Sequence, residues 1–291
     1  MNQIIHELLR LPPFLVSVIK LGMWLLALAL IFITVERLWS LRAQKIGRKD
    51  VLADVFYYFL NNLLPGIVLA FPLALMAVAV HRLLPWPMQQ FAVKLPDWAR
   101  LLAVFFVGQV GFYWAHRWTH EVPFLWRFHA LHHSAGEMDW LVNSRAHPID
   151  MIFTRLVGFI PIYALGLAQP TGRAIDIAAV AVQLIGMVWG FFIHANVRWR
   201  LGPLEWLFAT PAFHHWHHTN DSMRDRNYAA MLPWLDMLFG TYHLPPKEWP
   251  SVYGIDKPVS PTLLGQLFDP LLPEPKAKNP PHSGERVFKA N

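Results

Sequence analysis

Long apolar runs alternate with short polar segments along most of the chain. The runs cover approximately residues 17–35, 55–82, 99–115, 149–167 and 174–193. A helix that crosses a bilayer needs about 20 mainly apolar residues, and most of these runs approach or exceed that length. The pattern therefore predicts an all-α, polytopic membrane helical bundle with about five hydrophobic segments.

The second run, residues 55–82, is longer than one crossing requires. Asn61, Asn62, Pro65 and Pro72 interrupt it. A single tilted or kinked helix is the preferred interpretation, and a tight re-entrant hairpin is the alternative.

Composition and charge support a membrane protein and predict its orientation. The chain is 55% hydrophobic and only 15% charged, whereas soluble domains carry about 25% charged residues. The first run is followed by a basic cluster of Arg37, Arg42, Lys45, Arg48 and Lys49. The positive-inside rule places this cluster in the cytoplasm and the N-terminus on the opposite side. Lysines and arginines at the membrane surface account for the net charge of +6, and no basic stripe interleaved with aromatic residues indicates a nucleic-acid partner.

The runs divide the chain into three regions. Residues 1–98 form an N-terminal membrane region with two hydrophobic segments, and residues 99–245 contain three further spans. Residues 246–291 are a C-terminal extension. Residues 273–286 are almost wholly polar or proline, and residues 272–291 are therefore predicted to be a disordered tail.

Histidines are concentrated in three short groups with i,i+3 or i,i+4 spacing. On a helix this spacing brings imidazoles onto one face, where they can converge on a metal ion. The groups are His116 and His120; His129, His132 and His133; and His214, His217 and His218.

The predicted topology places these groups on one side of the membrane. His116 and His120 follow the third span, and two further spans separate His133 from His214. An even number of crossings returns the last group to the side of the first. If the second run crosses once, the cytoplasmic position of the basic cluster places the histidines in the cytoplasm as well, and we expect them to form a cytoplasmic metal-binding cap.

The residue types restrict the metal chemistry. The chain has no cysteine, which excludes thiolate sites, cysteine-ligated iron–sulfur clusters and disulfides. Neutral imidazole is a good ligand for iron, copper, nickel or zinc. Eight histidines are too many for one ion, so a pair of ions is the economical arrangement. Activation of dioxygen requires a redox-active metal, which favours iron over zinc.

Two other classes of protein use membrane histidines. A histidine-rich metal transporter would place ligands at the centres of the spans, whereas these groups lie at and beyond span ends. A b-type haem protein needs only one or two axial histidines. Asp139, Asp150 and Asp236 are candidates to accept the remaining imidazole N–H. The isolated histidines, which are His6, His81, His243 and His282, are interpreted as interfacial polar residues.

The motifs His116-Arg-Trp-Thr-His120, His129-Ala-Leu-His132-His133 and His214-His215-Trp216-His217-His218 resemble the histidine boxes of the fatty acid hydroxylase / sterol desaturase superfamily of integral membrane di-iron oxygenases. Flanking segments are similar as well: Ser144-Arg-Ala-His147-Pro148, His194-Ala-Asn196, Asn227-Tyr228 and Pro233-Trp-Leu-Asp236. The resemblance covers residues of about 100 to 243.

The resemblance implies a fold, a metal and a reaction. His147 and His194 would complete the coordination, and His215 would lie behind the ligands. Two iron ions, which zinc can replace in purified protein, would use O2 to hydroxylate or desaturate a lipid, either a fatty acyl chain or a sterol-like molecule. No fused b-type cytochrome motif is present, so electrons would come from a separate ferredoxin, cytochrome or reductase.

Overall fold

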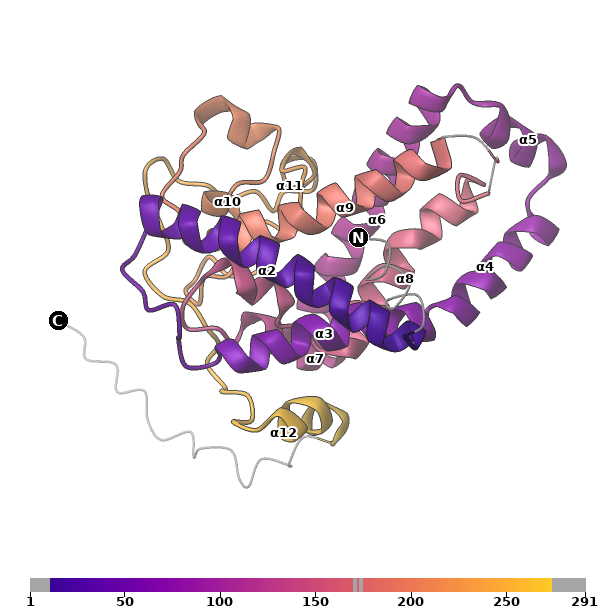
Figure 1. Cartoon of the computed structure of the whole chain (residues 1–291). Helices are drawn as coiled ribbons and strands as arrows, with labels where there is room; N and C mark the ends of the chain where they lie inside the picture. The colour runs from indigo at the N-terminus through magenta and orange to yellow at the C-terminus, as the bar shows by residue number, and fades with distance from the viewer. Residues whose placement is uncertain (1–10, 170–171, 173–174, 274–291) are drawn as a thin grey trace, which may run out of the picture.

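The structure, a computed structural model, describes residues 11–169, 172 and 175–273, without the side chains of residues 175–183. Within these residues the chain is helical, with isolated antiparallel bridges and no strand, as the sequence predicts (Figure 1). The α-helices are α2 (Pro13–Trp39), α3 (Val51–Val68), α4 (Ala70–Leu83), α5 (Trp86–Lys94), α6 (Asp97–Glu121), α7 (Pro123–His133), α8 (Pro148–Ala164), α9 (Ile175–His194), α10 (Pro211–His217), α11 (Trp234–Phe239) and α12 (Leu263–Phe268). Short 3₁₀ helices are η1 (Trp140–Ser144), η2 (Gly202–Trp206) and η3 (Asp269–Leu271).

Several helices are suited to a bilayer. Among the described residues, α2, α3 and α6 are each long and apolar enough to cross, and α4 with α5 adds a fourth candidate bent by 116°. The predicted fourth run forms α8, whose 17 residues span only about 25 Å, less than the hydrocarbon core of about 30 Å. These apolar helices make the chain an integral membrane protein. The five-span topology stays a prediction.

The long second run forms two helices in succession. Only Leu69 separates α3 from α4, and Figure 1 shows α4 continuing away from α3 instead of folding back along it. Pro72 has no N–H to donate to the carbonyl of Val68, so the helical ladder is interrupted at this point. The arrangement is that of a kinked helix over residues 51–83, and its single crossing of the membrane stays a prediction.

Helices α6 and α8 pack closely because small residues face each other. A Cβ atom on Gly111 would lie 2.5 Å from the carbonyl oxygen of Gly158. A Cβ atom on Gly158 would in turn lie 2.7 Å from the ring of Phe112. This contact fixes the position of the α6 end that carries His116 and His120.

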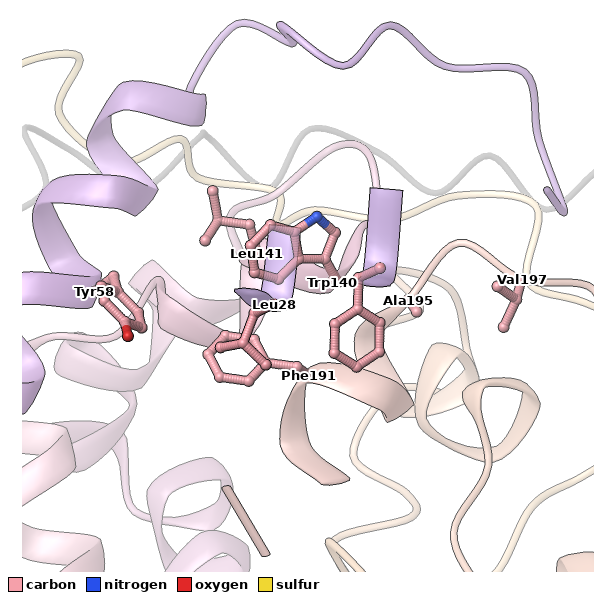
Figure 2. Packing of buried hydrophobic residues seen from close by; sticks show 8 residues of the cluster. Leu28, Tyr58, Trp140, Leu141, Phe191, Ala195 and Val197 are labelled. Atoms are coloured by element: carbon pink, nitrogen blue, oxygen red, sulfur yellow. The ribbon is translucent and has the colours of Figure 1, made fainter. Parts of the chain in front are cut away.

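A second core joins the N-terminal helices to the segments that follow the histidines. Figure 2 shows side chains from α2, α3, η1 and the end of α9 packed together. Phe32 of α2 stacks on Trp140 of η1 with ring centroids 5.8 Å apart. The buried members are Leu28, Phe32, Tyr58, Trp140, Leu141, Phe191, Ala195 and Val197.

The C-terminal extension folds back onto the helices. Asn220 N–H donates to the carbonyl of Val252 over 3.1 Å, and the hydroxyl of Tyr57 donates to Gln266 over 3.0 Å. Figure 1 shows α12 on the side of the molecule where α3 and α7 lie. Most of the predicted disordered tail, residues 274–291, lies outside the described residues.

Candidate metal centre

The structure gathers nine of the predicted ligands into two adjacent groups. Within each group, one ring nitrogen per residue lies within 4.8 Å of all the others. The first group is His116, His120, His129, His133 and His217, and the second is His132, His194, His214 and His218. All nine are buried or half-buried.

Two short helices divide their histidines between the groups. Residues four apart lie on nearly the same helix face, whereas the residue between them points aside. On α7, His129 and His133 therefore face the first group while His132 faces the second. At α10 the division is reversed, because His214 and the C-cap residue His218 belong to the second group and His217 belongs to the first.

The local sequence fixes where these helices begin. Pro123 starts α7 at a position where its missing N–H costs nothing. Thr210 caps α10 by accepting a hydrogen bond from Phe213 N–H. Each helix therefore presents its histidines in a fixed register.

Most of the grouped histidines form a hydrogen bond to the protein through Nδ1. The Nδ1–H groups of His116, His132, His194 and His217 donate to the carbonyls of Tyr228, Arg145, Gly190 and Arg226 over 2.7–3.0 Å. Those of His129 and His120 donate to carboxylates, Asp150 and Asp225, each at 3.0 Å. A neutral imidazole carries one N–H, so these contacts leave Nε2 as a lone pair.

The free lone pairs face one another. Nε2 of His132 lies 3.2 Å from Nε2 of His194, although neither atom has a proton to share. Nε2 of His120 and of His217 is buried with no hydrogen-bond partner. Unpaired buried acceptors are costly unless a cation is placed between them.

The spacing of the nitrogens fits a transition metal. Metal–nitrogen bonds of about 2.1 Å at angles of about 90–110° require nitrogens about 3.0–3.4 Å apart. In the second group His194 Nε2 lies 3.0 Å from His214 Nε2 and 3.2 Å from His218 Nε2. In the first group His133 Nε2 lies 3.2 Å from His129 Nε2. Each group therefore has the donor type and nitrogen spacing for one ion.

Burial keeps the imidazoles neutral. It is the largest cause that lowers the pKa of His132, His133, His214, His217 and His218 well below the usual value, and neighbouring histidines add to the effect. A lowered pKa leaves the lone pair available to a metal at neutral pH.

The tenth predicted ligand, His147, lies outside both groups. Its Nδ1 accepts the N–H of Ile149 and caps α8, and its Nε2 donates to the carbonyl of Leu267 at 3.0 Å. Both nitrogens are therefore occupied. His215 also lies outside, with Nε2–H bonded to Ala195 and Nδ1 to the hydroxyl of Tyr253.

The aspartates have different roles. Of the three candidates, Asp150 contacts a group histidine directly. Asp236 accepts from the N–H of Tyr228, whose carbonyl holds His116, and Asp139 caps η1. Asp225 was missed, because it belongs to an exposed loop and has no spacing relation to the boxes. Its positive φ of 63° is the conformation that turns it towards His120.

Four further histidines were interpreted as interfacial polar residues, and the structure describes two of them. His81 and His243 belong to neither group. His6 and His282 lie outside the described residues.

A cavity of about 730 Å³ reaches the first group. Its inner wall includes His120, His133 and His217, and its outer wall comes from residues 254–260 and 265–273 of the C-terminal extension. Charged residues of both signs line it, among them Arg127, Arg224 and Asp269. The volume lies in the range of ligand pockets.

Comparison with known proteins assigns the histidine-bearing region. The family described as "Fatty acid hydroxylase" matches residues 101–241. The ornithine lipid hydroxylase OlsE of Rhizobium tropici is 40% identical over 166 residues, which are 56% of this chain and 48% of that protein. Human alkylglycerol monooxygenase is 34% identical over 52% of this chain and 32% of its own length.

One relative is matched over more of its length. The methylsterol monooxygenase 2-2 of Arabidopsis thaliana is 26% identical over 72% of this chain and 78% of its own length. By contrast, the chain spans about half the length of the Rhizobium protein and about a third of the human one. No solved structure matches the chain.

Proposed function

Through residues 101–241 the chain belongs to the fatty acid hydroxylase / sterol desaturase superfamily, and from this premise we propose that it is a membrane-bound, iron- and O2-dependent enzyme that hydroxylates or desaturates a lipid. The observation that carries the proposal is the pair of converging histidine groups. One iron ion would be held by each group, and zinc could replace iron in purified protein.

Iron bound there would supply the one-electron chemistry that activates dioxygen. In a hydroxylation, one oxygen atom enters the C–H bond of the lipid. The other leaves as water, and a separate donor provides two electrons, accompanied by two protons. A ferredoxin, a b-type cytochrome or a reductase is suited to this task.

The protein's own residues would prepare the ligands. Asp150 and Asp225 hold His129 and His120 in the tautomer that leaves Nε2 free. A carboxylate that accepts the Nδ1–H also makes Nε2 more basic, and therefore a stronger electron-pair donor to a metal.

The lipid would approach the first group through the cavity of about 730 Å³. The relatives are named for ornithine lipid, alkylglycerol and methylsterol. Their shared feature is an amphipathic molecule that resides in the bilayer. A membrane lipid is therefore the proposed substrate class.

The main experiment removes one ligand from each group. His217→Ala and His132→Ala should each abolish product formation and lower the iron content of the purified protein, while the exposed His81→Ala variant keeps both. Lipids of an expressing strain, compared by mass spectrometry with those of a strain lacking the protein, report the product. Full activity of either ligand variant would refute the assignment.

The cytoplasmic orientation of the groups can be tested separately. Because the chain has no cysteine, single cysteines can be introduced and labelled. Lys45→Cys should react with an impermeant maleimide only after the membrane is opened, whereas Met88→Cys on α5 should react in intact cells. The reverse pattern would contradict the orientation.

A further inference from the structure

Three polar side chains of α2 and α3, two of them buried and one half-buried, contact the segments that hold the second histidine group. Both helices lie outside residues 101–241. Polar groups are rare in apolar helices unless they have a partner. The three side chains are Glu36 on α2 and Asp54 and Asn61 on α3.

Asp54 is connected to a histidine through one residue. Its Oδ1 accepts from Nε of Arg145 at 2.6 Å, and its Oδ2 accepts from Nη2 at 3.1 Å. The carbonyl of the same Arg145 accepts the Nδ1–H of His132 at 3.0 Å. The exposed fractions of Asp54 and Arg145 are 0% and 4%, so water does not compete for these bonds.

Arg48 strengthens the same connection. It pairs with Asp54 and, through Nε at 2.5 Å, with Asp139. Asp139 in turn caps η1, the 3₁₀ helix that precedes Arg145. The guanidinium group of Arg48 therefore lies between two carboxylates, those of Asp54 and Asp139.

Asn61 holds the same segment from another point of α3. Its Nδ2 donates to the carbonyl of Ala146 at 2.8 Å and to that of Ser144 at 3.3 Å. These residues flank Arg145, so the peptide carbonyl that meets His132 is fixed on both sides.

Glu36 bonds the backbone close to His194, another member of the second group. Its Oε1 accepts from the N–H of Trp140 at 2.8 Å and from that of Asn196 at 2.9 Å. Asn196 follows His194 by two residues, and the carboxylate thus links η1 to the end of α9. The core in Figure 2 lies at the same junction.

We infer that Glu36, Asp54 and Asn61 are positioning residues for the second histidine group, so that α2 and α3 are part of the catalytic apparatus. They act through Arg145 and Asn196 and do not contact the metal. The inference depends on the proposed function in one respect, namely that the second group holds an ion.

The test measures metal binding, independently of lipid oxidation. Full-length protein in detergent is stripped of metal and titrated with Co²⁺, whose visible absorption reports histidine coordination. The matched pair is Asn61→Ala and Asn62→Ala, because Asn62 is adjacent but bonds only the carbonyl of Tyr58 in its own helix. Asp54→Asn is the third variant, and far-ultraviolet circular dichroism monitors folding.

The wild type and Asn62→Ala should bind two Co²⁺ ions per chain. Asn61→Ala and Asp54→Asn should bind the first normally and the second about tenfold or more weakly, since loss of a group behind a ligand lowers metal affinity about 10- to 100-fold. If Asp54→Asn fails to fold, the asparagine pair decides the question alone.

Two results would overturn the inference. One is an Asn61→Ala protein with wild-type affinity for both ions, and the other is a folded Asn61→Ala protein in which both affinities fall equally. A wild-type chain that binds fewer than two ions would instead refute the proposed function, and the inference with it.

Discussion

At the scale of single residues, the use of the two ring nitrogens distinguishes His132, a member of the second group, from His147, which lies outside both groups. His132 bonds the protein through Nδ1 alone, whereas His147 uses both nitrogens. A lone pair that already accepts a backbone N–H is not available to a metal.

We therefore expect His147→Ala to keep the full metal content. The variant loses the cap of α8 and should be destabilised by about 1 kcal/mol. Iron per chain and the thermal midpoint in detergent measure the two effects. Loss of an ion from folded His147→Ala protein would restore His147 to the ligand set.

Buried histidines also predict how stability depends on pH. Burial lowers the pKa of His132, His133, His214, His217 and His218 in the folded state, while in the unfolded chain the value is about 6.5. Below pH 6.5 the unfolded chain binds more protons, so stability falls as the pH falls. The metal-free protein should have a lower thermal midpoint at pH 5.5 than at pH 7.5. A thermal midpoint that is higher at pH 5.5 than at pH 7.5 would contradict the burial argument.

The spacing of histidines was sufficient to find most members of the two groups but not their hydrogen-bond partners. His129, His132 and His133 are identified by the helical repeat alone. Asp225 is not, because it approaches His120 only through a loop conformation. His147 carried the right residue type in a matching motif, but a neighbouring backbone N–H and the carbonyl of Leu267 occupy its ring.

At the scale of elements, the crossing of α6 and α8 depends on two glycines. A methyl group at Gly111 would overlap the carbonyl of Gly158, and backbone cannot move aside as a flexible side chain can. The helix that carries His116 and His120 would then have to shift.

Gly111→Ala should accordingly destabilise the protein by about 1–3 kcal/mol. Gly22→Ala is the control, since a Cβ atom there meets nothing within 4 Å and alanine is the better helix former. Thermal midpoints of the two variants in the same detergent make the comparison. Equal midpoints would show that α6 and α8 separate without cost.

The elements themselves follow largely from the apolar pattern. The runs at 17–35 and 99–115 correspond to α2 and α6, and Pro72 accounts for the break between α3 and α4. The pattern could not reveal that Asp54 and Asn61 would bond the loop before α8. Such contacts depend on how helices pack, which periodicity does not encode.

At the scale of the whole molecule, the cavity lies between α7 and the C-terminal extension. Ala130 lines it from α7, whereas Phe124 on the same helix is 60% exposed. A large side chain at Ala130 would occupy space that the proposed lipid needs.

Ala130→Trp should therefore lower lipid turnover several-fold while iron per chain stays at the wild-type value. Phe124→Trp, which adds an indole outside the cavity, should leave both unchanged. Product formation and metal content are measured on the same preparations. Wild-type turnover by Ala130→Trp would indicate that the lipid takes another route.

The fold-back of the C-terminal extension was not predictable from its composition. Its prolines indicate irregular backbone, and nothing in the local sequence shows that Gln266 contacts Tyr57 of α3. Contacts over 209 residues follow from the assembled shape.

The junction between α2 and the end of α9 also bears on the order of folding. The backbone N–H of Arg42 bonds Asn196 across a separation of 154 residues, and Glu36 bonds it across 160. Contacts this distant in sequence close large loops and form slowly. During synthesis α2 is made long before its partner leaves the ribosome, so the second histidine group is completed only after most of the chain has been made. If the groups hold metal as proposed, its acquisition would consequently be a late step of biogenesis that follows membrane insertion of the N-terminal helices.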